Sequence, residues 1–125
     1  MQLTEHKPGN HHVIRRVENH RITVDQTALE SSFIVGARLL QPDWPVATLD
    51  ELDETQCVPL LSHQPEVVLI GFGERQSLFP PSLQSIFHRQ GIGVECMTLA
   101  AAARTFNILM SENRRALAAM ILPRD

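Results

Sequence analysis

The chain has few of the residues that build disulfide frameworks or aromatic surfaces. Its 125 residues include two cysteines, one tryptophan and no tyrosine. Cys57 and Cys96 are too few and too far apart for a disulfide framework, so we expect two buried thiols in a reducing compartment. A chain of this length can bury a core without such cross-links. The sequence therefore predicts an ordinary globular domain.

Charge and hydropathy exclude two further classes of protein. Eleven Lys and Arg residues against fourteen Asp and Glu residues give a formal net charge of −3, which offers no general reason to expect nucleic-acid binding. No apolar run approaches the roughly 20 residues of a membrane span, and the first residues lack the apolar centre of a signal peptide. We expect a cytoplasmic protein that binds no nucleic acid and does not insert directly into a membrane.

The sequence also lacks complete catalytic and cofactor motifs. It has no phosphate loop, no nucleophile elbow, no H-E-x-x-H and no CxxC. His6, His11 and His12 have no further ligand at a recognised spacing, so we expect solvated histidines and no metal site. Gly71-Phe72-Gly73 follows a predicted strand, but Gln76 stands where the third glycine of a dinucleotide fingerprint belongs. No cofactor is predicted, and a non-enzymatic role is favoured over an undetected enzyme.

The stretch from Thr98 to Leu122 predicts a helix, a short turn and a buried strand. Thr98 is a good N-cap, and Asn113 suits the left-handed conformation that ends a helix. Residues 116–122 include no polar side chain, so both faces of that strand should be covered. Apolar residues at helical spacing form one face of the helix: Leu99, Ala102, Ala103, Phe106, Leu109 and Met110.

Upstream of this stretch we predict a flexible N-terminal arm over residues 1–12 and a single α/β domain over 13–125. Residues 13–36 favour an antiparallel β-meander, with a turn at Asp25-Gln26-Thr27. Thr48 followed by Glu51 predicts the capping box of a helix, and Pro59 should interrupt that helix or split it into two pieces.

The second half of the chain has a β-α-β-α-β pattern. Residues 67–70 are continuously apolar and precede a glycine turn, whereas residues 92–97 alternate as in an edge strand. We therefore predict a layered α/β domain with a central mixed or parallel sheet. The last strand should lie beside 67–72, which lies beside 92–97, with the N-terminal meander on the far side. The two crossover helices should cover opposite faces.

One predicted site lies where neighbouring strands end. In open α/β sheets, ligands collect outside the carboxyl ends of strands, and the amides at a helix start can hold an anion. The residues at these strand ends are Gly71, Phe72, Gly73, Glu74 and Thr98.

Four more side chains are candidates for a role beyond the core. Glu112 and Arg114 follow the last helix, and Arg114 either complements the helix dipole or contacts a ligand. Asn107 lies near the apolar helix face and could tie the helix to the loop after Phe72 or to the turn at Glu112, with a solvated position or a pocket-lining position as alternatives. Trp44 lies between two prolines, either as a lid over the core edge or as an anchor for a protein partner.

Several segments together resemble a known family. They are Leu69-Ile70-Gly71-Phe72-Gly73, 91–98, 102–109 and Glu112-Asn113-Arg114 before an apolar last strand. Their sequences and their order resemble those of a small α/β family of largely unknown function. This family includes the mitochondrial assembly factor 3 for respiratory complex I and an adipogenesis-associated domain protein. Bacteria and archaea carry single-domain members. The resemblance is strong over residues 66–122 and looser over 20–44.

This resemblance implies a compact sheet with packed helices and no established enzyme activity. Many relatives have a cysteine where this chain has Ala103, so the most obvious nucleophile is missing here, and many have a glycine where this chain has Asn113. Our leading hypothesis is a non-enzymatic accessory or assembly factor that binds another protein. The alternative is a domain that binds a small molecule or anion, or an undetected enzyme, with its pocket at the strand ends.

Overall fold

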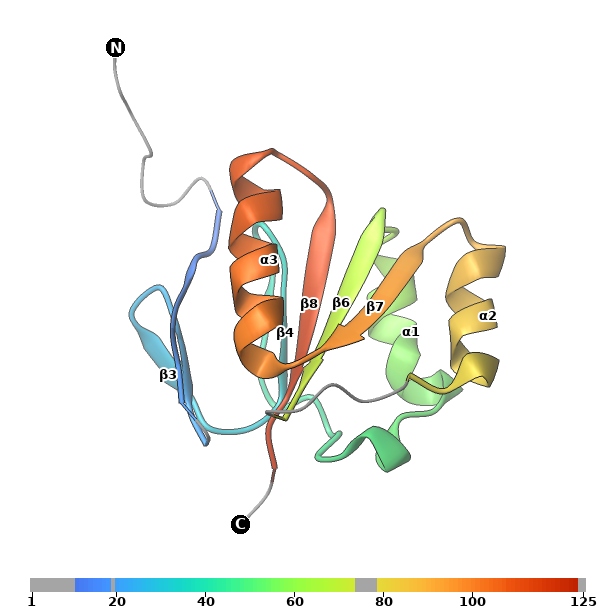
Figure 1. Ribbon diagram of the computed structural model, residues 1–125, viewed down its shortest axis with the longest axis horizontal. Coiled ribbons are helices and arrows are strands. Elements are labelled where there is room, and N and C mark those ends of the chain that lie inside the picture. Colours follow the sequence, from blue (N-terminus) through green and yellow to red (C-terminus); the bar gives the residue numbers. More distant parts are fainter. Residues whose placement is uncertain (1–10, 19, 74–78, 124–125) are drawn as a thin grey trace.

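A five-stranded mixed sheet forms the centre of the protein in the computed structural model, which describes residues 11–18, 20–73 and 79–123 (Figure 1). The strand order is β5-β4-β8-β6-β7. The strands are β4 (Phe33–Val35), β5 (Leu40–Gln41), β6 (Val67–Phe72), β7 (Gly93–Met97) and β8 (Ala116–Ile121). β6 runs parallel to β7 and β8, whereas β4 is antiparallel to β5 and β8. The predicted fold class and the order of the last three strands are confirmed.

The apolar content of each strand explains its place in this sheet. All six residues of β8 are buried, which agrees with a central strand covered on both faces. In β7, Gly93 and Glu95 are exposed while Val94 between them is buried, as expected of an edge strand. The sequence pattern therefore fixes which strand lies inside the sheet and which lies at its rim.

Helices cover both faces of the sheet, as the handedness rule predicts. α1 (Glu54–Ser62) and α2 (Pro81–Arg89) lie on one face, and α3 (Leu99–Ser111) lies on the other (Figure 1). Alternate residues of β6 point to different cores: Leu69 packs with Phe106 of α3, whereas Val68 packs with Phe87 of α2. The sheet thus separates two apolar layers.

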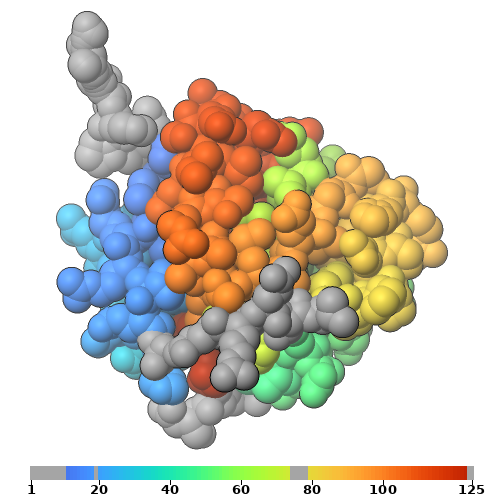
Figure 2. Space-filling view, in the orientation of Figure 1, coloured from blue at the N-terminus to red at the C-terminus, as the bar shows by residue number. Residues whose placement is uncertain are grey.

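A second, smaller sheet lies beside α3. Its strands β1 (Ile14–Val17), β2 (Ile22–Val24) and β3 (Thr27–Leu29) are antiparallel in that order. Their buried residues join the core of α3, and the atoms of this region lie directly against α3 (Figure 2). The prediction of one meander alongside the last strand is therefore only partly right, since β4 and β5 alone occupy that place.

The turn into β3 is shorter than predicted. Thr27 begins β3, and Asp25-Gln26 form the two turn residues. Asp25 has a φ of 55°, and Asp tolerates this left-handed conformation better than most residues. A two-residue hairpin turn that uses positive φ matches the twist of the flanking strands.

The predicted arm over residues 1–12 falls largely outside the described residues, which begin at His11. The backbone N–H of His12 donates to the carbonyl of Ala37 at 2.9 Å. The last residue of the predicted arm is therefore hydrogen-bonded to the connection between β4 and β5.

The structure around α1 differs from two predictions, the capping box at Thr48 and the interruption at Pro59. Thr48 precedes only the short 3-10 helix η1 (Leu49–Glu51), and its side chain makes no capping bond. Glu51 accepts from the Ala47 N–H at 2.7 Å instead. The α-helix begins later because Asp53 is its N-cap and accepts from the Gln56 N–H at 2.9 Å.

Pro59 does not interrupt this helix, contrary to the prediction. α1 continues through it to Ser62. A proline removes the hydrogen bond to the carbonyl four residues earlier, here that of Thr55. Thr55 is exposed, so water can reach that turn of the helix.

The predicted start and end of α3 are confirmed, and α2 has ends of the same kind. The Thr98 hydroxyl accepts from the Ala101 N–H at 3.1 Å, and Asn113 has a φ of 59° after α3. α2 has Pro81 at its first position, and Gly91 beyond its end has a φ of 74°.

Candidate functional site

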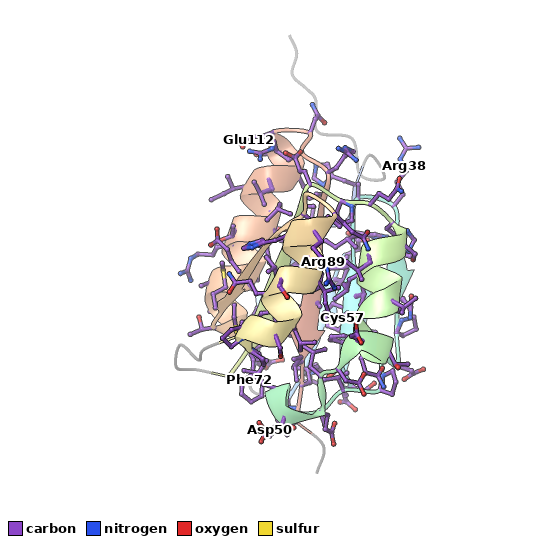
Figure 3. The ribbon with its side chains drawn as sticks, turned by 90° about the vertical axis from the view of Figure 1, so that its right-hand side faces the viewer. Arg38, Asp50, Cys57, Phe72, Arg89 and Glu112 are labelled. Atoms are coloured by element: carbon purple, nitrogen blue, oxygen red, sulfur yellow. The ribbon has the colours of Figure 1, made fainter. Side chains whose placement is uncertain are left out.

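The structure separates the predicted site residues instead of gathering them. Figure 3 shows Phe72 and Glu112 labelled near opposite ends of the molecule. Phe72 lies at the carboxyl ends of the parallel strands, and so do Gly71, Gly73 and Thr98. Glu112 and Arg114 belong to the other end, where β8 begins, and Asn107 lies on α3 between them. Glu74 lies outside the described residues.

At the carboxyl ends of the strands, Gly71 is a packing position within β6 and not part of a glycine turn, which corrects that prediction. A Cβ there would lie 2.8 Å from the Met120 sulfur and 2.9 Å from the Ala102 Cβ. Only a residue without a side chain lets α3 and β8 approach β6 so closely. The turn comes afterwards, at Gly73 with a φ of 69°.

The start of α3 has internal partners for several polar groups. The Leu99 N–H donates to the Gly73 carbonyl at 3.0 Å. The Thr98 hydroxyl and carbonyl accept from the Ala101 and Ala102 N–H groups. An anion at this helix start would have to compete with these bonds. The predicted anion site therefore gains no support from this geometry.

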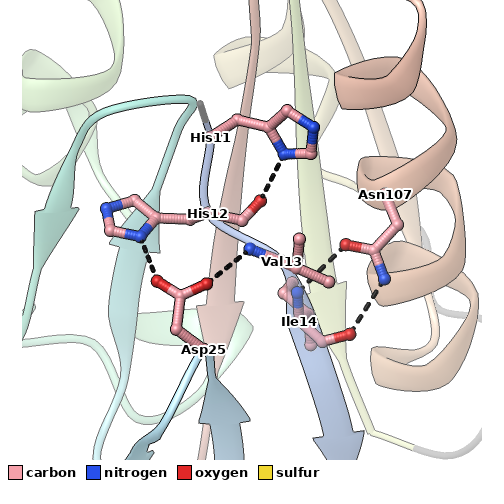
Figure 4. A network of polar contacts seen from close by, with 6 residues as sticks. All are labelled: His11, His12, Val13, Ile14, Asp25 and Asn107. Carbon is pink, nitrogen blue, oxygen red and sulfur yellow. Dashed lines mark hydrogen bonds and ion pairs between the residues drawn. The ribbon is translucent and has the colours of Figure 1, made fainter. Parts of the chain in front are cut away.

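Asn107 ties α3 to β1 through both backbone polar groups of one residue (Figure 4). Its Oδ1 accepts from the Ile14 N–H at 3.0 Å, and its Nδ2 donates to the Ile14 carbonyl at 2.9 Å. The side-chain amide thus acts as a neighbouring strand would. The predicted role as a tie is found, but the predicted partners, the loop after Phe72 and the turn at Glu112, are wrong.

Two further polar contacts, both made by Asp25, lie next to this tie (Figure 4). Asp25 Oδ1 accepts from the Val13 N–H at 3.0 Å, and Asp25 Oδ2 lies 2.6 Å from His12 Nδ1. Burial raises the pKa of Asp25, but the hydrogen bonds with His12 and Val13 lower it more, so that the pKa lies below its usual value. This carboxylate fastens the segment before β1 to the β2–β3 turn.

Arg114 pairs with a carboxylate at the amino ends of the parallel strands. Its Nη2 donates to Glu66 Oε2 at 2.9 Å, and its Nη1 lies 4.0 Å from Glu112 Oε1. Glu66 Oε1 also accepts from the Arg115 N–H at 3.0 Å. The hydrogen bonds from Arg114 and Arg115 lower the pKa of Glu66. Arg114 therefore links the start of β8 to the start of β6.

Beside this ion pair lies a hollow of about 350 Å³ that the sequence did not predict. Its residues come from the β4–β5 connection, the end of α1 and the beginning of β8. Its lining is formed by His11, Ala37, Arg38, His63, Pro65, Met110, Asn113, Arg114, Arg115, Ala116 and Leu117. Isolated exposed cations such as Arg38 give no pattern in a sequence, so of the three arginines here only Arg114 is a predicted site residue.

A larger hollow of about 500 Å³ lies at the carboxyl end of β8 and includes Trp44. Trp44 is only 2% exposed, and its indole N–H donates to the Gln56 carbonyl at 3.0 Å. Ser32 is buried below, where its hydroxyl accepts from the Leu122 N–H and donates to the Val46 carbonyl. Trp44 is thus a lid over the core, and as placed its ring offers little surface as an anchor for a partner.

The two thiols have environments that suppress their reactivity. Burial, with the nearby carboxylates of Asp53 and Glu54, raises the pKa of Cys57 to about 11. Cys96 is only partly buried, so the prediction of two buried thiols is right for Cys57 alone, but burial also raises the pKa of Cys96. Since the thiolate is the nucleophile, neither cysteine is activated. In the described ranges, no three His, Cys, Asp or Glu side chains are grouped so as to hold a metal ion.

These features define a small layered α/β domain whose most specific polar contacts fasten one segment of the chain to another. The chain belongs to the family described as protein of unknown function (DUF498/DUF598), which matches residues 14–121. No helix in the described part of the chain has the length and apolar character needed to cross a membrane.

Known proteins similar to this chain include an assembly factor. NADH dehydrogenase (ubiquinone) 1 alpha subcomplex assembly factor 3 of Xenopus tropicalis is 31% identical over 92 residues, which cover 72% of this chain and 49% of that protein. The matches span 49% to 58% of the length of the curated relatives.

Solved structures share the fold over nearly the whole chain. A Xanthomonas campestris protein is 37% identical with a TM-score of 0.83, covering 98% of this chain and 92% of that one. A Bordetella pertussis protein described as an Mth938-like domain is 26% identical with a TM-score of 0.80, covering 100% of this chain and 94% of that one. The family resemblance and the fold predicted from the sequence are thereby confirmed.

Proposed function

We propose that this chain is a bacterial, cytoplasmic accessory factor that acts by binding another protein and not by catalysis. The observation that carries this proposal is the similarity to the assembly factor of Xenopus tropicalis over 92 residues. An assembly factor works through contacts with the proteins that it helps to assemble. The raised pKa values of both thiols agree with a role that needs no activated cysteine.

Two exposed apolar side chains offer a way to find the face that a partner contacts. Ile108 on α3 is 57% exposed and Val58 on α1 is 56% exposed. They lie on helices that cover opposite faces of the sheet, so a partner that contacts one face would not contact the other. Because both side chains are exposed, replacing either with serine should leave the fold intact.

The test is affinity capture of the tagged full chain from cells that express it natively, with quantitative mass spectrometry. We expect a specific protein to be enriched by the unaltered chain, and to be lost with either Ile108→Ser or Val58→Ser but retained with the other. Each variant is thus the control for the other. Recovery of no specific protein, together with reproducible turnover of a small molecule by the purified chain, would refute the proposal.

A further inference from the structure

The hollow at the amino ends of β6 and β8 combines cationic walls with an apolar floor. Pro65, Met110, Ala116 and Leu117 supply the apolar part, and Arg38, Arg114 and Arg115 supply guanidinium groups. Figure 3 shows Arg38 at the same end of the molecule as Glu112. This concentration of arginines is unexpected in a chain with a formal charge of −3.

The three guanidinium groups are not equally available. Arg114 is paired with Glu66 and Glu112, so most of its charge is already compensated. Arg115 donates from Nη1 to the Gln64 carbonyl at 2.8 Å, which leaves its other N–H groups. Arg38 is exposed and makes no side-chain hydrogen bond or ion pair with any residue in the described ranges. Arg38 and Arg115 therefore retain donors for a ligand.

We propose that this hollow binds an amphipathic oxyanion: a carboxylate or phosphate headgroup on a short apolar chain. The planar donor fork of Arg38 suits either headgroup, since arginine forms paired, charge-assisted hydrogen bonds with both. The apolar chain lies against the apolar part of the lining, which is formed by Pro65, Met110, Ala116 and Leu117, and displaces water from it. This site is independent of any protein partner.

The site differs from the one that the sequence predicted. The carboxyl ends of the strands are the usual place for ligands in open α/β sheets, but here Met120 and Ala102 fill the space beside Gly71. The hollow lies at the opposite end, where β4, β8 and the end of α1 meet. Its cations come from residues 38, 114 and 115, which the antiparallel pairing of β4 with β8 brings to one place.

The test is NMR titration of the ¹⁵N-labelled full chain with hexanoate and hexyl phosphate, with hexanol and acetate as probes that lack the charge or the chain. We expect either amphipathic anion to shift the amide signals of Ala116 and Leu117 in a saturable way. We expect acetate and hexanol to bind at least about tenfold more weakly, since each lacks one of the two interactions. The tighter of the two anions identifies the headgroup.

Two variants distinguish binding in this hollow from a general attraction of anions to any exposed arginine. Arg38→Ala should weaken the binding of the preferred anion about tenfold, as expected from the loss of a charge-assisted hydrogen bond. Arg104→Ala removes the same charge from an exposed position of α3 that does not line the hollow, and should leave binding unchanged. The proposal is overturned if neither anion binds better than hexanol, or if both variants bind as the unaltered chain does.

Discussion

Asn107 pairs with both the N–H and the carbonyl of Ile14, and so joins α3 to the smaller sheet by a contact that spans 93 residues of sequence. Ile14 is itself 5% exposed and packs in the core that α3 shares with β2. Without the amide, both backbone groups of Ile14 would lose these partners. The contact therefore fixes the position of β1 against the helix.

Replacing Asn107 with alanine should lower the free energy of unfolding by about 1–3 kcal/mol, because it leaves partly buried backbone groups unpaired. Urea unfolding of the purified chain measures this change. Ser111→Ala is the control, since that hydroxyl bonds only to the Ile108 carbonyl of its own helix, on the exposed side. Equal unfolding midpoints for the two variants would contradict the role assigned to Asn107.

Gly71→Ala should destabilise the fold by about 1–3 kcal/mol, since the added methyl group would overlap Met120 and Ala102 in a packed core. Gly93→Ala is a matched control in the neighbouring strand. There the nearest atoms to an added Cβ are 3.7 and 3.8 Å away, an ordinary contact distance. Thermal unfolding of both variants tests the difference, and a Gly71→Ala variant as stable as Gly93→Ala would show that the core can shift to admit the methyl.

The pair formed by His12 and Asp25 predicts a loss of stability in acid. The folded pKa of Asp25 lies below its usual value of 3.8, so the folded state binds fewer protons than the unfolded state in that range. The contribution of Asp25 is present above the usual value and lost as the pH falls through the lower, folded pKa. It should be small, because the Asp25 side chain is 43% exposed and water screens the pair.

Urea unfolding at about pH 6 and about pH 3 tests this linkage. The unaltered chain should lose more stability between these values than Asp25→Asn, which keeps an oxygen for the Val13 N–H but has no carboxylate to protonate. The pKa of Glu66 is also lowered, but Glu66 is present in both proteins and contributes the same loss of stability to each. The difference between the two proteins therefore reports on Asp25. An identical loss in the two proteins would contradict the lowered pKa.

Cys57 should react slowly with thiol reagents near neutral pH, because its pKa of about 11 leaves little thiolate and the residue is fully buried. The measurement is the rate of modification by a disulfide reagent in a Cys96→Ala background, with and without denaturant. The native rate should be a small fraction of the denatured rate. Equal rates would mean that Cys57 is accessible in the folded chain.

Much of the fold could be predicted because it depends on local patterns. The unbroken apolar run of β8 and the alternation of β7 placed one strand inside the sheet and the other at its edge. Thr98 marked the start of α3 through its hydroxyl, and Asn113 marked the end through its left-handed backbone. These signals need no knowledge of distant residues.

The parts that were missed depend on contacts between distant segments. β3 has only three residues and no buried one, so its sequence carries no strand pattern. The separation of the two sheets follows from the packing of β1 on α3, including the bond between Asn107 and Ile14. The hollow was missed for the same reason, since Arg38, His63 and Arg115 meet only after the strands pair.

The proposal that the chain acts by binding a protein is tested most directly with purified components. Analytical ultracentrifugation of this chain mixed with the protein recovered by affinity capture measures whether the two sediment together. We expect one faster boundary at a fixed stoichiometry, which disappears with the serine variant that abolished capture. Two independent boundaries at every concentration up to the cellular one would contradict the proposal.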